Sequence, residues 1–180
     1  MKHLWAVGAA LALVIVPLAA EPVAQQVADS LIVPGERVGP ISVGMSTKQL
    51  FAVMNDPVET HTLGDNGRFG TQYLWGSWAS GLQASTDKNG VVTEVTTTQP
   101  AFATSDKVQI GSSSLMVTAI LGRPGTSYQT LYRCSANASF HCAINCYKSG
   151  LEIAFNLDDG RVIQIRVRSP KNALKPCDRK

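Results

Sequence analysis

The chain has 180 residues, of which 16 are Lys or Arg and 13 are Asp or Glu, so its formal net charge is +3. Hydrophobic residues make up 44% of it, enough to form the core of one compact unit or of two small fused ones. The basic residues are scattered up to the last predicted strand and the tail, which argues against a nucleic-acid-binding function.

The N-terminus has the layout of a secretory signal peptide. Lys2 and His3 form a short basic start, an apolar run extends from Leu4 to Ala20, and Glu21 follows. We expect residues 1–20 to be a signal peptide and the protein to be periplasmic or secreted. Leu18 is larger than the residue that cleavage sites prefer three positions upstream, which leaves the scissile bond open. The alternative is an uncleaved membrane anchor.

Processing near Ala20 would leave a chain of low net charge. It removes Lys2 and no acid, so 15 basic and 13 acidic side chains remain. No cysteine follows the apolar run directly, so we expect no lipid attachment there and no stable membrane anchor. The mature protein is expected to be a monomer.

The mature part contains an internal sequence match, because Ile41–Pro57 resembles Val108–Pro124. A second match joins Gly81–Val95 to Gly150–Ile165. A match of this length indicates a repeated supersecondary unit. We therefore predict an N-terminal extension over residues 21–37, a first repeat over 38–100 and a second repeat over 101–180. The identical positions are Gly44 and Gly111, Ser46 and Ser113, and Pro57 and Pro124.

Each copy is predicted to begin as a helix and to continue as a sheet. Ser46 stands three positions before Gln49, as in a capping box, and Leu50, Val53 and Met54 then fall on one helical stripe. Asp158-Asp159-Gly160 lies between two alternating segments and predicts a hairpin. The sequence thus predicts an α+β fold of two tandem repeats, each a helical segment packed on an antiparallel sheet of about three strands.

The stretch Val38–Ser46, followed by a helix and an Asn/Gly-x-Pro stop, resembles the repeat unit of the beta-lactamase-inhibitor-protein-like fold. That fold is similar to that of the SmpA/OmlA small outer-membrane assembly lipoproteins. The resemblance covers roughly Val33 to Val167. It implies a helical hairpin packed on an antiparallel sheet, with two such sheets forming a concave surface that binds a protein. The chain departs from the lipoproteins in lacking a lipidated cysteine.

The even number of cysteines in an exported chain predicts two disulfides. If the strands form a meander, Arg168 ends beside Cys146, which favours a bond from Cys146 to Cys177 and leaves Cys134 for Cys142. A metal site could instead use His141 beside Cys142 and Cys146, but the spacing matches no common zinc pattern. We predict no metal. The cysteines are Cys134, Cys142, Cys146 and Cys177.

Catalytic signatures are scarce in this chain. It has none of the common nucleophile, metalloprotease or phosphate-loop motifs. His61 is expected to be an exposed loop residue, and the adjacent carboxylates Asp158 and Asp159 are explained as turn formers. We predict no catalytic residue and no cofactor, and therefore no enzyme.

Four aromatic residues lie close together in the first copy, and they are either core or anchors for a protein partner. On a strand, Tyr73 and Trp75 would share one face, whereas Gly76 separates them from Trp78. The four are Phe69, Tyr73, Trp75 and Trp78.

Alternation divides the last strand into two faces. We expect Ile163, Ile165 and Val167 to face the helices, and Gln164, Arg166 and Arg168 to face away. Exposed Arg is most often simply solvated, but on a concave sheet it could meet an acidic partner. In the matching strand of the first copy, the predicted inner residues are Thr93 and Val95, and the predicted outer ones are Val92, Glu94 and Thr96.

The sequence therefore predicts an exported, non-catalytic protein-binding module. Its partner would be a protein, and its role that of an inhibitor or immunity-type protein acting on an extracytoplasmic hydrolase. The alternative is a cell-envelope assembly or structural factor. The predicted partner-binding residues are Tyr73, Trp75, Trp78, Arg166 and Arg168.

Overall fold

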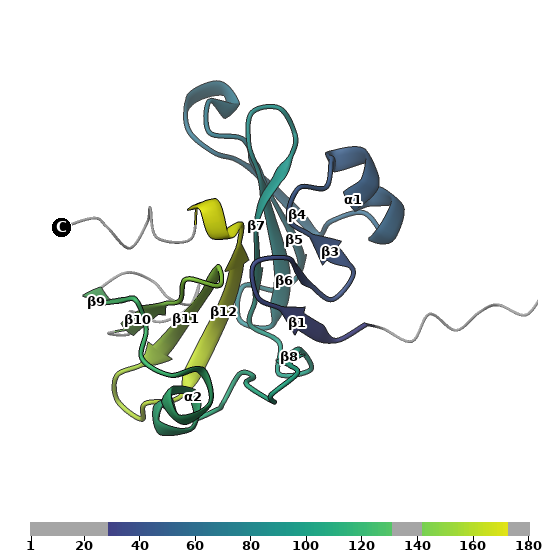
Figure 1. The fold of residues 1–180 in the computed structure, drawn as a ribbon. Coiled ribbons are helices and arrows are strands. Elements are labelled where there is room, and N and C mark those ends of the chain that lie inside the picture. The colour runs from purple at the N-terminus through teal and green to yellow at the C-terminus, as the bar shows by residue number, and fades with distance from the viewer. Residues whose placement is uncertain (1–28, 131–141, 173–180) are drawn as a thin grey trace, which may run out of the picture.

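The computed structural model describes residues 29–130 and 142–172. Strands dominate these segments, and the only α-helices in them are two short ones (Figure 1). The helical elements are α1 (Thr47–Val53), η1 (Asp65–Gly67), α2 (Ser114–Leu121) and η2 (Pro170–Asn172). The strands are β1 (Leu31–Val33), β2 (Arg37–Val38), β3 (Ile41–Ser42), β4 (Glu59–Thr62), β5 (Thr71–Gly76), β6 (Gly81–Thr86), β7 (Val92–Thr97), β8 (Ala103–Thr104), β9 (Thr126–Thr130), β10 (Cys142–Cys146), β11 (Leu151–Asn156) and β12 (Val162–Arg168).

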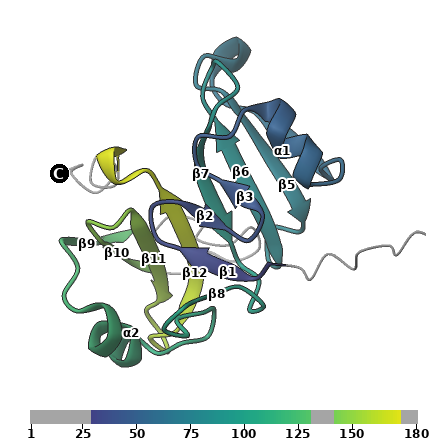
Figure 2. The ribbon, with the colours of Figure 1, turned by 45° about the vertical axis from the view of Figure 1, so that its right-hand side comes forward.

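Eight of the strands form one sheet, in the order β4-β5-β6-β7-β12-β11-β10-β9. Every neighbouring pair in this sheet is antiparallel, including β7 and β12, which pair Val95 with Val167 and Glu94 with Arg168. A four-stranded sheet, β3-β2-β1-β8, lies across one face of the large sheet (Figure 2). Its strands β2 and β3 contact β7 at the centre of the large sheet.

Both α-helices begin at a serine cap. The Ser46 side chain accepts a hydrogen bond from the Gln49 backbone N–H, and the Gln49 side chain accepts one from the Ser46 N–H at 2.9 Å. The predicted capping box is therefore confirmed. Ser113 caps α2 in the same way through the Met116 N–H. Each helix buries a single side chain, Leu50 in α1 and Val117 in α2.

One hydrophobic core lies between the large sheet, the helices and the small sheet. Leu50 and Val117 reach it from the helices, and Ile32 reaches it from the small sheet. The large sheet contributes Val95 from β7 and Ile165 from β12, both fully buried. Burying an aliphatic side chain of this size contributes about 1.5–3 kcal/mol to the free energy of folding. Because both halves of the chain supply such side chains, the shared core holds the two halves together.

The predicted α+β fold of two helix-plus-sheet repeats is wrong. The described chain is mostly β, and its two α-helices have only seven and eight residues. The physical reason is the direct pairing of β7 with β12, which makes one continuous sheet over one core. The strands β4 and β9, at the two edges of that sheet, come from threonine-containing segments that were not predicted as strands.

Two β-bulges correct the predicted faces of the strands. A register shift between Ala154 and Phe155 places Val162 in the core and packs Ile163 in a separate cluster with Ile144, Cys146 and Ala154. A shift between Ser85 and Thr86 likewise brings Val92 into the core, where Thr93 had been expected. A bulge adds one residue to one strand, so the alternation of side chains reverses beyond it.

Of the four cysteines, Cys142 and Cys146 lie among the described residues, at the two ends of β10. Neither is a free thiol, and both are disulfide-bonded. Cys134 and Cys177 lie outside the described residues, as do His141 and the predicted signal peptide, so the pairing stays a prediction. Within residues 29–130 and 142–172, neither helix is long and apolar enough to cross a membrane.

Candidate functional site

The face of the large sheet opposite the helices carries most of the polar side chains of the central strands. Residues paired directly across antiparallel strands share a face, so the register defines two rows that cross this sheet. We call this surface the outer face. One row consists of Glu59, Leu74, Gln83, Thr96, Arg166 and Glu152, and the other of His61, Gln72, Ser85, Glu94 and Arg168.

Four charged side chains meet at the centre of the outer face, and we call them the charge cluster: Glu94, Glu152, Arg166 and Arg168. Arg166 lies 3.1 Å from Glu94 (Nε to Oε1) and 2.6 Å from Glu152 (Nη1 to Oε1). Arg168 lies 2.6 Å from Glu94 (Nη2 to Oε2) and 3.4 Å from Glu152 (Nη1 to Oε2). Each carboxylate thus contacts both guanidinium groups, so the four form a closed ring of ion pairs.

The charge cluster is largely enclosed. The Glu152 side chain is 5% exposed and the Arg168 side chain 14%, while Glu94 and Arg166 are somewhat more open. Burial acts to raise the pKa of Glu94, but the Arg166 and Arg168 guanidiniums outweigh it and hold that pKa below its usual value. Burial also acts to lower the pKa of Arg166, and Glu94 and Glu152 outweigh it and raise that pKa. Both groups therefore stay ionised at neutral pH.

A second group of polar side chains lies at the edge of the outer face, on and beside β4. The Trp78 indole Nε1 donates a hydrogen bond to Glu59 Oε2 at 3.2 Å, and His61 Nε2 lies 2.9 Å from the same oxygen. The Trp78 and His61 rings are 5.5 Å apart. Gln72 donates to Gln83 at 3.2 Å and so joins this edge to the centre. His61 is exposed, as predicted, but it lies on an edge strand rather than in a loop.

The structure separates the predicted partner-binding residues. Arg166, Arg168 and Trp78 belong to the outer face. Trp75 is only 8% exposed and lies in the core, where its Nε1 donates to the Asn55 carbonyl at 2.7 Å. Tyr73 points to the same side and packs edge-on against Phe51 at 5.2 Å.

The prediction that Trp75 is a surface anchor is therefore wrong, and the alternative that it belongs to the core holds. Alternation along β5 explains this, since Trp75 shares a face with Tyr73 beneath α1 and not with Gln72 and Leu74.

Sequence reasoning missed four members of the site: Glu59, Gln72, Gln83 and Glu152. Glu152 was aligned within the repeat but was not recognised as the partner of Arg166. A usable signal existed, because a lone acid in an otherwise apolar strand, Leu151–Asn156, needs an opposite charge nearby when that strand is buried.

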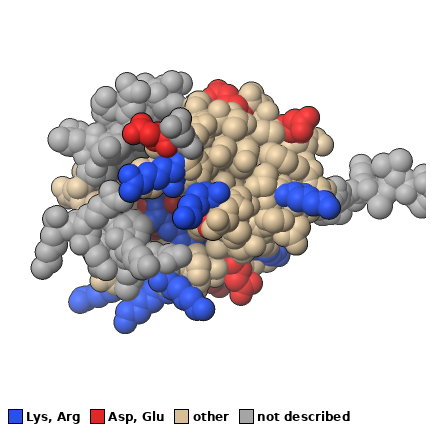
Figure 3. All heavy atoms as spheres, turned by 90° about the horizontal axis from the view of Figure 1, so that it is seen from above, with Lys and Arg blue, Asp and Glu red and all other residues tan. Residues whose placement is uncertain are grey.

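Figure 3 shows basic and acidic side chains gathered around a hollow in the surface seen from above.

Neither a protein-family model nor a curated protein matches the chain. Among solved structures, its fold is similar to that of YjgB, a DUF4309 family protein from Bacillus subtilis, with 14% identity and a TM-score of 0.52 over 75% of this chain and 88% of that one. It is also similar to a cysteine-rich secretory protein from Staphylococcus aureus, with 13% identity and a TM-score of 0.50 over 80% of this chain and 50% of that one. The chain thus spans half the length of the staphylococcal protein, and at these identities the likeness shows the fold alone.

A more distant likeness joins the chain to a candidate beta-lactamase inhibitor protein from Streptococcus mutans, with 19% identity and a TM-score of 0.31 over 66% of this chain and 79% of that one. A TM-score this low supports no inference about the present chain. The predicted similarity to the SmpA/OmlA lipoproteins is not among these likenesses and stays a prediction.

Proposed function

We propose that this chain is an exported, non-catalytic protein-binding module that recognises its partner with the outer face. The observation that carries the proposal is the presence on one sheet face of Trp78, a half-buried aromatic side chain beside the edge strand β4, and of the charge cluster at the centre. In the described part of the chain, no helix packs on this face. An aromatic anchor beside fixed charges suits recognition of a protein surface.

The electrostatics of the charge cluster favour recognition over catalysis. A general acid or base works best when its pKa lies near the working pH. The pKa of Glu94 is instead held low by Arg166 and Arg168, so this carboxylate is a poor proton donor or acceptor at neutral pH. Charges locked in a ring of ion pairs keep a fixed pattern, which helps to orient a partner of complementary charge.

Within this proposal, the partner is an extracytoplasmic hydrolase that the outer face inhibits, as the resemblance to the beta-lactamase-inhibitor-protein-like fold implies. The test is affinity capture from a cell-envelope extract with the mature protein as bait. The Trp78→Ala variant should retain at least about tenfold less of the specific partner, because truncating an aromatic anchor costs about 2 kcal/mol or more of binding.

The matched control is Phe69→Ala, which truncates an aromatic side chain that is 66% exposed and lies outside the two cross-strand rows. It should leave capture unchanged. The retained protein is then assayed for hydrolase activity with and without one equivalent of the mature chain. Equal capture by the wild type and Trp78→Ala would refute recognition through the outer face, whereas a retained membrane assembly complex would refute the inhibitor role.

A further inference from the structure

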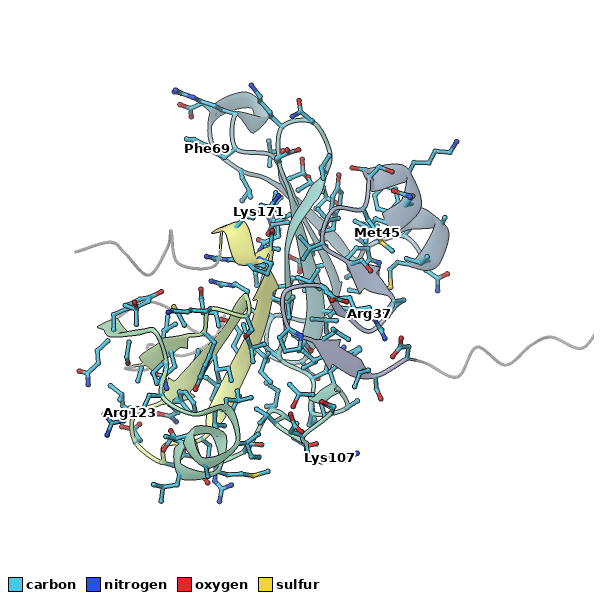
Figure 4. The ribbon with its side chains drawn as sticks, in the orientation of Figure 1. Arg37, Met45, Phe69, Lys107, Arg123 and Lys171 are labelled. Carbon is cyan, nitrogen blue, oxygen red and sulfur yellow. The ribbon has the colours of Figure 1, made fainter. Side chains whose placement is uncertain are left out.

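The large sheet has an open edge at β4. This strand pairs with β5 on one side, and no described strand pairs with it on the other. All of its residues, Glu59–Thr62, are exposed, although their side chains alternate between the two faces of the sheet. Figure 4 shows Phe69 in the loop that leads from this strand to β5. The described part of the chain thus leaves this edge uncovered.

The hydrogen bonds of β4 show which of its backbone groups point outward. The Leu63 N–H donates to the Gly70 carbonyl at 2.9 Å, in line with the register of β4 and β5. Bonded and non-bonded residue pairs alternate along an antiparallel ladder, so His61 bonds to β5, whereas Thr60 and Thr62 do not. The backbone N–H and C=O groups of these two threonines therefore point away from the sheet.

The neighbouring ladder supports this assignment. The Ser77 N–H donates to the Ser80 carbonyl at 3.2 Å, so by the same alternation the backbone of Tyr73 bonds to β6. Tyr73 is the residue opposite Thr60 in the pairing of β5 with β4. The Thr60 backbone therefore lacks a bond to β5, and no other described residue supplies one. Unpaired backbone groups along an edge are a template for a further strand.

The side chains along this edge are complementary to themselves. If two copies of β4 pair antiparallel about a two-fold axis at Thr60, the N–H and C=O of Thr60 meet the same groups of the second copy. Glu59 then lies directly opposite His61 of the second copy, and the reverse pair forms across the axis. A carboxylate and an imidazole placed directly opposite each other stabilise a strand pair. A shift by one residue would set outward groups against inward ones, so the backbone excludes it.

Apolar side chains beside the edge would be covered by the same pairing. Val58 is 69% exposed and Phe51 is 40% exposed. The Phe51 ring packs edge-on against Tyr73, which pairs with Thr60, so it lies next to the unpaired strand. In the two-fold arrangement, Val58 stands opposite Thr62 of the second copy. Exposed apolar groups gathered at one place are typical of an interaction surface.

We propose that β4 is a dimer interface, at which two copies of this chain pair edge to edge and antiparallel about a two-fold axis at Thr60. The two large sheets then continue into each other, and neither copy keeps an open edge at β4. This dimer replaces the monomer expected from the sequence. It does not rest on the proposed recognition of a partner by the outer face, because it requires only this chain.

The first test is sedimentation velocity of the purified mature protein from about 1 μM to about 1 mM, where a dimer should form as the concentration rises. Thr60→Pro should weaken the dimer at least about tenfold and leave the Tm of the monomer nearly unchanged, because the lost N–H bonds to nothing within the chain. Leu115→Ser, at an 83% exposed position on α2, is the control and should leave the dimer intact. A monomer at every concentration, a dimer that persists in Thr60→Pro, or one that Leu115→Ser abolishes would overturn the proposal.

The second test exchanges the charges and keeps the backbone, so it holds even if Thr60→Pro fails to fold. Glu59→Lys should weaken the dimer severalfold, because it removes the acceptor opposite His61 of the second copy. The double variant Glu59→Lys/His61→Glu restores opposite charges across the axis and should recover the dimer. A double variant that dimerises no better than Glu59→Lys would contradict the proposed register.

Amide hydrogen exchange followed by ¹⁵N–¹H NMR locates the interface directly. The Thr60 and Thr62 amides should exchange more slowly in concentrated than in dilute protein, since only the second copy can bond to them. The His61 amide bonds to β5 and should be protected equally in both. Exchange at Thr60 that does not depend on concentration, in a protein that does dimerise, would place the interface elsewhere and refute the proposal.

Discussion

At the scale of single residues, Glu152 depends most on its neighbours. Its side chain is 5% exposed, with Arg166 at 2.6 Å from Oε1 and Arg168 at 3.4 Å from Oε2, the latter without hydrogen-bond geometry. An ionised carboxylate with so little contact with water relies on these guanidiniums, and each guanidinium in turn relies on a carboxylate. Removing one member of such a buried network leaves an uncompensated charge, which costs more than the intact network contributes.

Glu152→Gln is therefore expected to lower the free energy of unfolding by about 3 kcal/mol, because Arg166 and Arg168 would then share Glu94 alone. The matched control is Glu59→Gln, the same change at an exposed edge position, which should cost less than about 0.5 kcal/mol. Urea denaturation of the three proteins measures both. Similar losses in the two variants would contradict the special dependence of the charge cluster on Glu152.

Acid should destabilise the protein through Glu94. Arg166 and Arg168 outweigh burial and lower the pKa of Glu94 in the folded state below its usual value, so Glu94 adds stability at neutral pH that is lost as the pH falls through the folded-state pKa. The raised pKa of Arg166 adds stability that is fully present and constant near neutral pH. Urea denaturation between about pH 3 and pH 7 should show that the free energy of unfolding falls only on the acid side. In Glu94→Gln, this free energy should fall less steeply with decreasing pH. If the free energy of unfolding of Glu94→Gln depended on pH as steeply as that of the wild type, Glu94 would be excluded as a cause of the acid destabilisation.

At the scale of elements, glycines mark where strands approach closely. Gly150 lies in the β10–β11 turn with φ +87, and a Cβ there would stand 2.2 Å from the Arg168 carbonyl oxygen and 2.8 Å from the Gly35 Cα. Gly111 has nearly the same φ, +88, but has open space around it. The two positions share the cost of the left-handed conformation and differ only in the clash.

Gly111→Ala should therefore lower stability by about 1 kcal/mol, from backbone strain alone. Gly150→Ala should cost at least twice as much, since two backbone segments must also separate. Thermal unfolding of both variants provides the comparison. A Gly150→Ala protein as stable as Gly111→Ala would show that the β10–β11 turn can move to accommodate the added methyl group without a loss of stability.

Elements differ in how far the sequence alone predicts them. The start of α1 could be predicted because its capping box is contained in four consecutive residues, Ser46 to Gln49. The inward position of Val92 and the displacement of Ile163 could not, because each follows from a bulge that depends on the partner strand. The outward direction of Arg166 and Arg168 was predicted by alternation, but their neutralisation by Glu94 and Glu152 depends on strand pairing that no local pattern encodes.

At the scale of the whole molecule, β7 and β12 join segments that lie far apart in the chain. Internal similarity between Ile41–Pro57 and Val108–Pro124 led to a prediction of two tandem repeats, each with its own sheet, because a sequence match shows no contact between its copies. The structure instead pairs Val95 with Val167 and places both in one core. A shared sheet and a shared core make the two halves depend on each other for stability.

The protein should therefore unfold as one cooperative unit. Trp75 and Trp78 both lie before β7, so tryptophan fluorescence reports on the first half, while methyl NMR signals of Val162 and Ile165 in β12 report on the second. Both probes should give the same urea midpoint, since losing either half would expose the core of the other. A Val167→Ala variant opens a cavity where β12 pairs with β7, and it should lower the free energy of unfolding by about 1–3 kcal/mol. Both probes should then report the same lowered urea midpoint. Separate midpoints, or a loss confined to the β12 signals, would instead indicate two units that unfold independently.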